Sequence, residues 1–80
     1  MNRFEFVVAA RREGIRDGAY SLEGGFPSER YVLSIESGGW SVYYAERGEK
    51  VGDEHFDTED DACTWLLFLL MKSSATHDVW

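Results

Sequence analysis

The stretch RYVLSIESGGWSVYYAERGEK, residues 30–50, decides the fold. Apolar and polar residues alternate along its first part, which is the two-residue period of a strand with one buried face. Residues 37–39, Ser-Gly-Gly, follow as a turn, because glycine reaches the backbone angles that tight hairpins need. In the next run, Trp40, Val42 and Tyr44 match the apolar face of the first. The sequence therefore predicts an antiparallel hairpin.

Weaker strand patterns flank this hairpin. AYSLEGG, residues 19–25, ends in two glycines, and FPSE, residues 26–29, is expected to turn the chain. After the charged turn at residues 47–50, the run VGDEHF, residues 51–56, is a poor strand that suits a short edge position. We therefore expect an antiparallel meander of three or four strands.

Residues 2–13 fit either a strand or a helix. Phe4, Phe6 and Val8 alternate as in a strand. Asn2, however, is a good helix N-cap, and the run Ala-Ala-Arg-Arg-Glu that ends the segment consists of helix formers. We predict a helix.

Residues 56–75 form the clearest helix. Thr58 stands where an N-cap is expected, three acidic residues fill the first turn, and Lys72 lies near the end, so the charges complement the helix dipole. One apolar stripe is expected to face the core, formed by Ala62, Trp65, Leu66 and Leu69.

These elements predict a single α+β domain over residues 1–80. With a helix at each end and a small sheet between them, both helices are expected to pack on one face of the sheet. The other face would then be open to water. The expected core includes Trp40, Leu33 and Leu66, and residues 75–80 are expected to form a loose tail.

Composition narrows the possible partners. The chain has a net charge of −7, which argues against nucleic acids and anionic membranes and favours a basic protein. The longest apolar run is too short to span a bilayer. A single cysteine and a start without a signal-peptide pattern lead us to expect a cytoplasmic protein.

The sequence predicts no enzyme, no cofactor and no metal. His55 and His77 lack the companion ligands that a metal site needs. Cys63 lies among acidic residues, which disfavour a thiolate, so it is expected to be a small buried apolar residue. The glycine pairs do not have the spacing of a phosphate-binding loop.

Two features point to a surface that binds a protein. From Glu46 to Asp61 there are eight carboxylates and two basic residues, giving 2 − 8 = −6. This segment is either a solvated acidic face or a docking face for a basic partner. Tyr43 is expected on the sheet face away from the helices, where it is either a lone exposed tyrosine or the centre of an interface.

The order and spacing of several motifs resemble a family of small immunity proteins encoded beside bacterial polymorphic toxins, over about residues 20–70. The motifs are Tyr20 with Gly24-Gly25, Gly39-Trp40 with Val42 and Tyr44, Glu46-Arg47-Gly48, and Phe56 with the helix start from Glu59 to Cys63. Some members neutralise NAD-hydrolysing toxins that are delivered by type VI or contact-dependent secretion.

The resemblance implies a protein that binds its cognate toxin and blocks the active site or substrate entry, without catalysis of its own. The residues expected at that contact are Phe26, Tyr43, Glu46, Arg47 and Glu49. Phe68 and Met71 lie away from the core stripe of the last helix, and their flank is expected to support packing or a homodimer. The alternative function is a small acidic adaptor or activator of a cytosolic enzyme.

Overall fold

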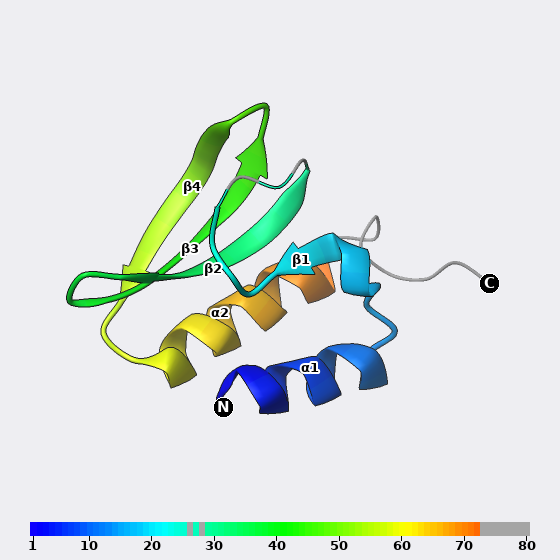
Figure 1. The fold of residues 1–80 in the computed structure, drawn as a ribbon. Coiled ribbons are helices and arrows are strands. Elements are labelled where there is room, and N and C mark those ends of the chain that lie inside the picture. The colour runs from blue at the N-terminus through cyan, green and yellow to red at the C-terminus, as the bar shows by residue number, and fades with distance from the viewer. Residues whose placement is uncertain (26, 28, 73–80) are drawn as a thin grey trace.

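The fold is α+β, as predicted. In the computed structural model, which describes residues 1–25, 27 and 29–72, the chain forms two helices and a four-stranded sheet (Figure 1). The order of elements is α1 (Arg3–Arg12), a 3₁₀ turn η1 (Asp17–Ala19), β1 (Tyr20–Ser21), β2 (Arg30–Glu36), β3 (Gly39–Glu46), β4 (Glu49–Phe56) and α2 (Glu59–Lys72). Neither described helix is long and apolar enough to cross a bilayer. The tail expected to be loose, residues 75–80, lies outside the described residues.

Helix α1 confirms the choice of helix over strand for the first segment. Asn2 Oδ1 accepts a hydrogen bond from the backbone N–H of Glu5 at 2.8 Å, and Glu5 Oε1 accepts one from the N–H of Asn2 at 2.8 Å. This reciprocal capping box satisfies two N–H groups that a helix start otherwise leaves without partners. The alternation of Phe4, Phe6 and Val8 was therefore the weaker signal.

The sheet has the order β1-β2-β3-β4, and β2, β3 and β4 form the predicted antiparallel meander. Ile35 pairs with Trp40 and Tyr31 with Tyr44, so the two alternating runs share one register. Strand β4 is an edge strand, as predicted, but at eight residues it is longer than the short strand we expected.

The antiparallel expectation is wrong for β1, which is only two residues long and pairs in parallel with β2. The glycines at 24 and 25 do not close a hairpin. Instead, the Gly24 N–H donates to the carbonyl of Leu33 at 3.0 Å, within β2. The β1–β2 connection therefore returns along the sheet before β2 begins. As a result, β1 and β2 run in the same direction.

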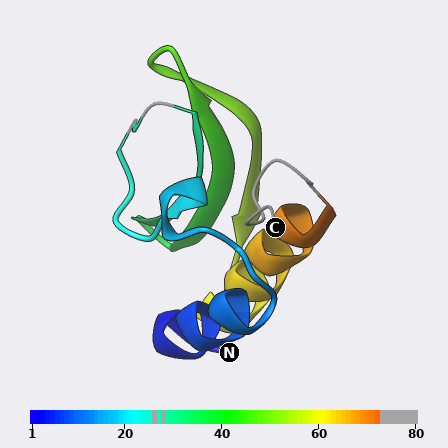
Figure 2. The same ribbon diagram turned by 90° about the vertical axis from the view of Figure 1, so that its right-hand side faces the viewer.

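The main core lies between the sheet and the two helices, which pack on the same face (Figures 1 and 2). Leu33 and Leu66 are fully buried there, as predicted, whereas Trp40 packs against the cluster and is only half-buried. Helix α2 is rotated from the expected stripe. Its buried residues are Ala62, Cys63, Leu66 and Leu70.

The second face of the sheet is covered around Tyr43, which corrects the expectation that this residue would be exposed. Val32, Tyr43 and Ala45 form a separate buried cluster on this face, and Tyr43 is 2% exposed. The Tyr43 hydroxyl donates to the carbonyl of Gly25 at 2.7 Å, so the β1–β2 connection lies over the ring. Lys50 Nζ lies 4.6 Å from the ring centroid. Burial also raises the Tyr43 pKa above its usual value.

The adjacent tyrosines therefore lie on opposite faces of the sheet. Tyr44 points to the helix side, where its ring meets that of Tyr31 edge-on at 4.9 Å between centroids. Tyr43 fills the space beneath the β1–β2 connection on the opposite side. A strand that is covered on both faces explains why an aromatic pair interrupts the alternation in β3.

Candidate functional site

The lone thiol is unsuited to nucleophilic chemistry. Cys63 is fully buried in the main core, and burial, followed by the nearby Glu59 carboxylate, raises its pKa from 9.0 to about 11. A reactive cysteine needs the opposite setting, with partial exposure and positive charge. Within the described residues, no group of three or more His, Cys, Asp or Glu side chains could hold a metal ion. His77 lies outside them.

Cys63 is expected to resist alkylation in the folded chain. A pKa two units above the usual value reduces the thiolate about 100-fold near pH 8, and only the thiolate reacts. We therefore expect iodoacetamide to label the native chain at least about 100-fold more slowly than the urea-unfolded chain at pH 8. Equal labelling rates would contradict the buried position. Because Cys63 is the sole cysteine, the labelled fraction measured by mass spectrometry reports on this residue alone.

The raised pKa of Cys63 also makes the free energy of unfolding depend on pH in the alkaline range. The folded pKa is raised, so this contribution to the free energy of unfolding is complete below pH 9 and is lost as pH rises toward 11. We expect the urea midpoint to fall across this range, and to fall less in Cys63→Ala. Tyr20, Tyr43 and Tyr44, whose pKa values burial also raises, contribute to the decline that remains in that variant.

Ser41, Asp53 and His55 meet on the second face of the sheet. Ser41 Oγ donates to Asp53 Oδ1 at 2.6 Å and lies 3.4 Å from His55 Nδ1, while His55 Nε2 lies 3.6 Å from Asp53 Oδ2. A serine nucleophile must be accessible and must donate to the histidine that a carboxylate orients. Here the serine is 0% exposed and donates to the carboxylate. The cluster therefore joins β3 to β4 and is not a catalytic triad.

Sequence reasoning missed this cluster because it depends on a β-bulge. Val42 pairs with Glu54 but Tyr44 pairs with Val51, so two residues of β4 stand opposite Tyr43. Gly52 has a φ of +66°, as glycine bulges often require. The only sequence signal was this glycine inside a strand pattern, and that signal does not reveal the register on its far side.

The residues expected at the partner contact do not form one site. Glu46, Arg47 and Glu49 are brought together and exposed at the β3–β4 turn, where Arg47 and Gly48 have φ values of +52° and +79°. Positive φ at both central positions matches a type I′ turn. Tyr43 is buried on the second face, and Phe26 lies outside the described residues.

An acidic edge runs from this turn along β4. Glu49, Asp53 and Glu54 belong to the strand, and Asp57 follows its end. Each of these residues is exposed. We call this row the acidic edge.

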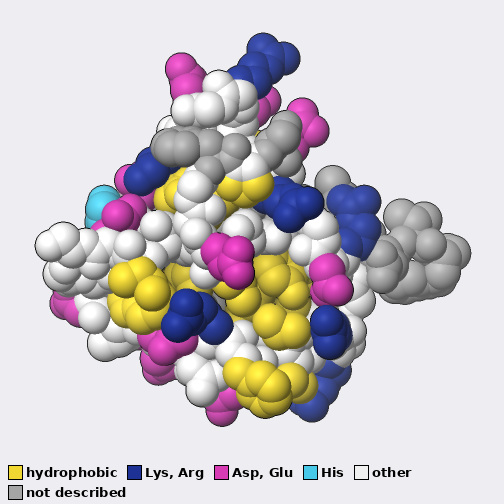
Figure 3. All heavy atoms as spheres, in the orientation of Figure 1, with side chains coloured by type: hydrophobic (Ala, Val, Ile, Leu, Met, Phe, Trp, Pro, Cys, Tyr) yellow, Lys and Arg dark blue, Asp and Glu magenta, His cyan; other side chains and the backbone are white. Residues whose placement is uncertain are grey.

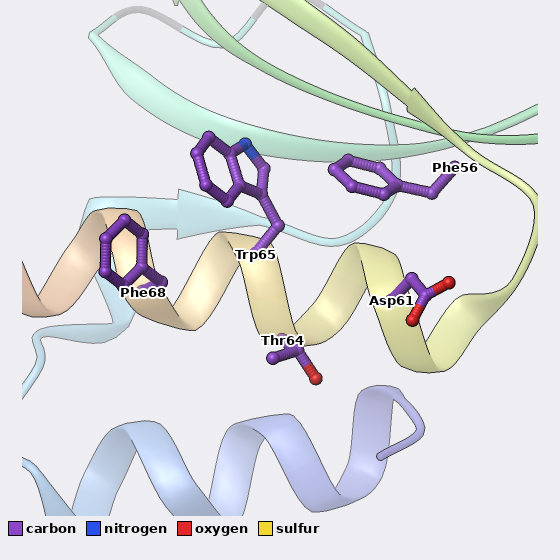
Figure 4. A pocket seen from close by; sticks show the side chains of 5 residues that line it. All are labelled: Phe56, Asp61, Thr64, Trp65 and Phe68. Carbon is purple, nitrogen blue, oxygen red and sulfur yellow. The ribbon is translucent and has the colours of Figure 1, made fainter.

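An apolar groove of about 450 Å³ opens beside the end of the acidic edge. Five side chains line it: Phe56, Asp61, Thr64, Trp65 and Phe68. Figure 4 shows Trp65 standing on α2 between Phe68 of the same helix and Phe56 of β4. The Trp65 and Phe68 rings are stacked, with centroids 5.4 Å apart, and the Phe56 and Trp65 centroids are 6.4 Å apart. We call this feature the aromatic groove.

Trp65 connects the aromatic groove to a second hollow of about 300 Å³. The second hollow is lined from β2 and β3 by tyrosines, from β4 by Val51 and Glu54, and from α2 by Trp65 and Leu69. Val51 is 50% exposed and Phe68 is 47% exposed. The flank between β4 and α2 is therefore apolar over a continuous length, with Met71, 48% exposed, farther along α2.

The sequence predicted only part of this apolar flank, namely some of the residues contributed by α2. Phe68 and Met71 were expected to lie away from the core stripe of α2, and they are 47% and 48% exposed. Trp65, however, was assigned to the core stripe, and Phe56 was named only as part of the motifs of the resemblance. Their meeting depends on how far α2 is rotated against β4, which the periodicity of neither element reveals.

Elsewhere in the described part of the chain, the large exposed apolar side chains are Phe4 and Val8 on α1 and Ile35 on β2. On the face seen in Figure 3, apolar side chains form separate patches with acidic and basic side chains between them. A hollow at the end of α1 is lined by Arg11, Gly14, Ile15, Arg16 and Asp17, and Arg11 is paired with Asp17 at 3.5 Å. The β4–α2 flank is therefore the better candidate for a protein contact.

Comparison with known proteins gives no relative from which to transfer a function: no family model, curated protein or solved structure matches the chain. The resemblance to immunity proteins stays a prediction.

Proposed function

We propose that this protein is a cytoplasmic immunity protein that binds a cognate bacterial toxin and blocks its active site or substrate access. The observation that carries the proposal is the acidic edge lying beside the aromatic groove. Apolar side chains can provide the affinity of a contact, while surrounding charges select and attract the partner. The net charge of −7 favours a basic partner surface.

A binding role also fits the polar chemistry of the described residues. The thiol is buried with a raised pKa, and the serine beside His55 is buried and bound to a carboxylate. An inhibitor that acts by occlusion needs neither group to react. The toxin class suggested by the resemblance is an NAD hydrolase, and its proposed contact surface is basic.

Co-expression tests the proposal. The chain is expressed with the product of the gene adjacent to its own, and survival of the host cells is compared with expression of that product alone. We expect the neighbour to be toxic alone and harmless with the chain, and the two proteins to co-purify. A harmless neighbour that co-purifies and gains enzymatic activity would instead support the adaptor function.

Charge reversal at the β3–β4 turn tests the electrostatic part. Glu46→Lys with Glu49→Lys is expected to weaken partner binding about tenfold at low salt, because attraction between exposed charges acts over roughly a Debye length. The salt dependence of binding should also become weaker. A matched control, Glu13→Lys with Glu23→Lys, makes the same charge change at exposed positions outside the acidic edge. If both double variants bind alike, net charge matters but the turn does not.

A further inference from the structure

Strand β4 is the last strand of the sheet, so its outer edge is paired with no other strand among the described residues. In the sheet order β1-β2-β3-β4 it pairs only with β3, and no other described strand lies beside it. Such an edge presents backbone N–H and C=O groups that can pair with another chain. The bulge at Gly52 interrupts the regular geometry, and of residues 53–56 that follow it, residues 54–56 pair with β3 in regular register. This part ends at Phe56, which lines the aromatic groove.

We propose that residues 53–56 accept an extended segment of a protein partner as a fifth strand, with an apolar side chain of that segment seated in the aromatic groove. The segment alternates apolar and basic residues. This inference rests on the proposed function in taking the ligand to be a protein, and it adds the mode of binding. Strand addition gives affinity through backbone hydrogen bonds and specificity through pockets for alternate side chains.

The alternation of apolar and basic residues in the partner segment follows from the two faces of β4. Phe56 pairs with Trp40 and Glu54 with Val42, so they lie on the helix side, where the groove is. Asp53 contacts Ser41 on the opposite side. Successive side chains of an added strand point to the same two sides. One set therefore meets the aromatic groove, and the other meets the carboxylate of Asp53.

Charge decides between a basic partner and a second copy of the chain. Strand β4 carries Glu49, Asp53 and Glu54 against a single lysine, and Asp57 and Asp61 lie close to its end. Pairing β4 with itself would bring two such rows together, and like charges opposite one another destabilise a sheet. A segment rich in Lys or Arg meets the same row favourably. The edge thus selects a heterologous basic strand.

Trp65 provides an independent observation at the groove. Its indole Nε1 is buried and, among the described residues, is the one buried side-chain nitrogen or oxygen without a hydrogen-bond partner. An unsatisfied donor of this kind is unfavourable in the free protein. Figure 4 places this nitrogen on the side of the ring that faces Phe56. A backbone carbonyl of the added segment, reached by a small rotation of the half-buried indole, would satisfy it.

The test uses a synthetic probe, so it does not depend on the natural partner. The probe is a nine-residue peptide that alternates lysine with valine and phenylalanine, titrated into ¹⁵N-labelled full-length protein. We expect saturable binding with a Kd below about 1 mM. The largest chemical-shift changes should fall on the backbone amides of residues 53–56 and on the Trp65 indole N–H. The same peptide with alternate backbone amides N-methylated should bind at least about tenfold more weakly, because it cannot pair with a strand edge.

Three results would overturn the inference. They are no saturable binding, shifts confined to the β3–β4 turn or α1, and equal binding of the N-methylated peptide. Concentration-dependent dimerisation of the chain alone, with shifts at residues 53–56, would also overturn it in favour of a second copy.

A paired variant tests the groove itself. Thr64→Arg places a cation at an exposed groove-lining position on α2, and Val8→Arg makes a matched change at an exposed position on α1. We expect Thr64→Arg to weaken peptide binding at least about tenfold through steric blockage and charge repulsion, while Val8→Arg binds normally. Equal binding by both variants, with unchanged thermal unfolding, would contradict the groove assignment.

The inference and the proposed function fail in different ways. If the peptide binds at β4 but the chain does not protect cells from its neighbour, the toxin assignment is wrong and the strand site stands. If the chain protects cells and Thr64→Arg protects equally well, the immunity function stands and the strand site is wrong.

Discussion

Replacing Leu66 with alanine is expected to reduce the free energy of unfolding by about 2–5 kcal/mol. Leu66 is 0% exposed and belongs to the cluster that joins α2 to α1 and the sheet. The substitution removes apolar contacts and leaves a cavity that surrounding side chains fill only in part. A domain of this size has a total stability of roughly 4–12 kcal/mol, so the loss is a large fraction.

Thermal unfolding measures this effect. A loss of that size is expected to lower the Tm by on the order of 10–30 °C. Leu67→Ala is the matched control, because Leu67 is adjacent on the helix, has the same side chain and is only half-buried. Its Tm should fall distinctly less. An unchanged Tm in Leu66→Ala, or an equal fall in both variants, would show that the buried face of α2 is wrongly placed.

Replacing Gly39 with alanine is expected to destabilise the fold by roughly 1–3 kcal/mol through a backbone clash. A Cβ on Gly39 would lie 2.5 Å from the carbonyl oxygen of Phe56, and the φ of Gly39 is +158°. The obstructing atom belongs to the backbone, so relief requires β3 and β4 to separate at this end. Phe56, which lines the aromatic groove, would move with that backbone.

The neighbouring glycine is the control for this prediction. Gly38 has a φ of +85°, but a Cβ there would meet nothing within 4 Å. Gly38→Ala therefore reports the cost of a positive φ alone, about 1 kcal/mol. Urea unfolding of both variants separates the two effects. If Gly39→Ala is no less stable than Gly38→Ala, the close approach to Phe56 is not as described.

Local signals predicted most of the elements. The Asn2 and Thr58 caps marked the two helix starts, and Asn2 and Thr58 accept the expected hydrogen bonds from Glu5 and Asp61. The alternation around the Ser-Gly-Gly turn gave the register of β2 and β3. These signals depend on residues close together in the chain, so one sequence suffices to read them.

Features that depend on distant contacts were not predictable in this way. The parallel pairing of β1 and the burial of Tyr43 both follow from the path of the β1–β2 connection across the sheet. Gly24 and Gly25 would be equally compatible with a tight hairpin and with a connection that crosses the sheet. The aromatic groove likewise requires the rotation of α2 against β4, which is determined by packing with α1 and the sheet.

Hydrogen exchange of the complex tests the central claim, that the β4–α2 flank is the contact surface for a protein partner. The chain is expressed with the product of the adjacent gene, and backbone amide exchange is compared in the free and bound protein. We predict that protection on binding is largest in β4, Glu49–Phe56, and along the part of α2 that carries Trp65 and Phe68. Protection confined to α1 or to the β1–β2 connection, with β4 exchanging as in the free protein, would contradict the account.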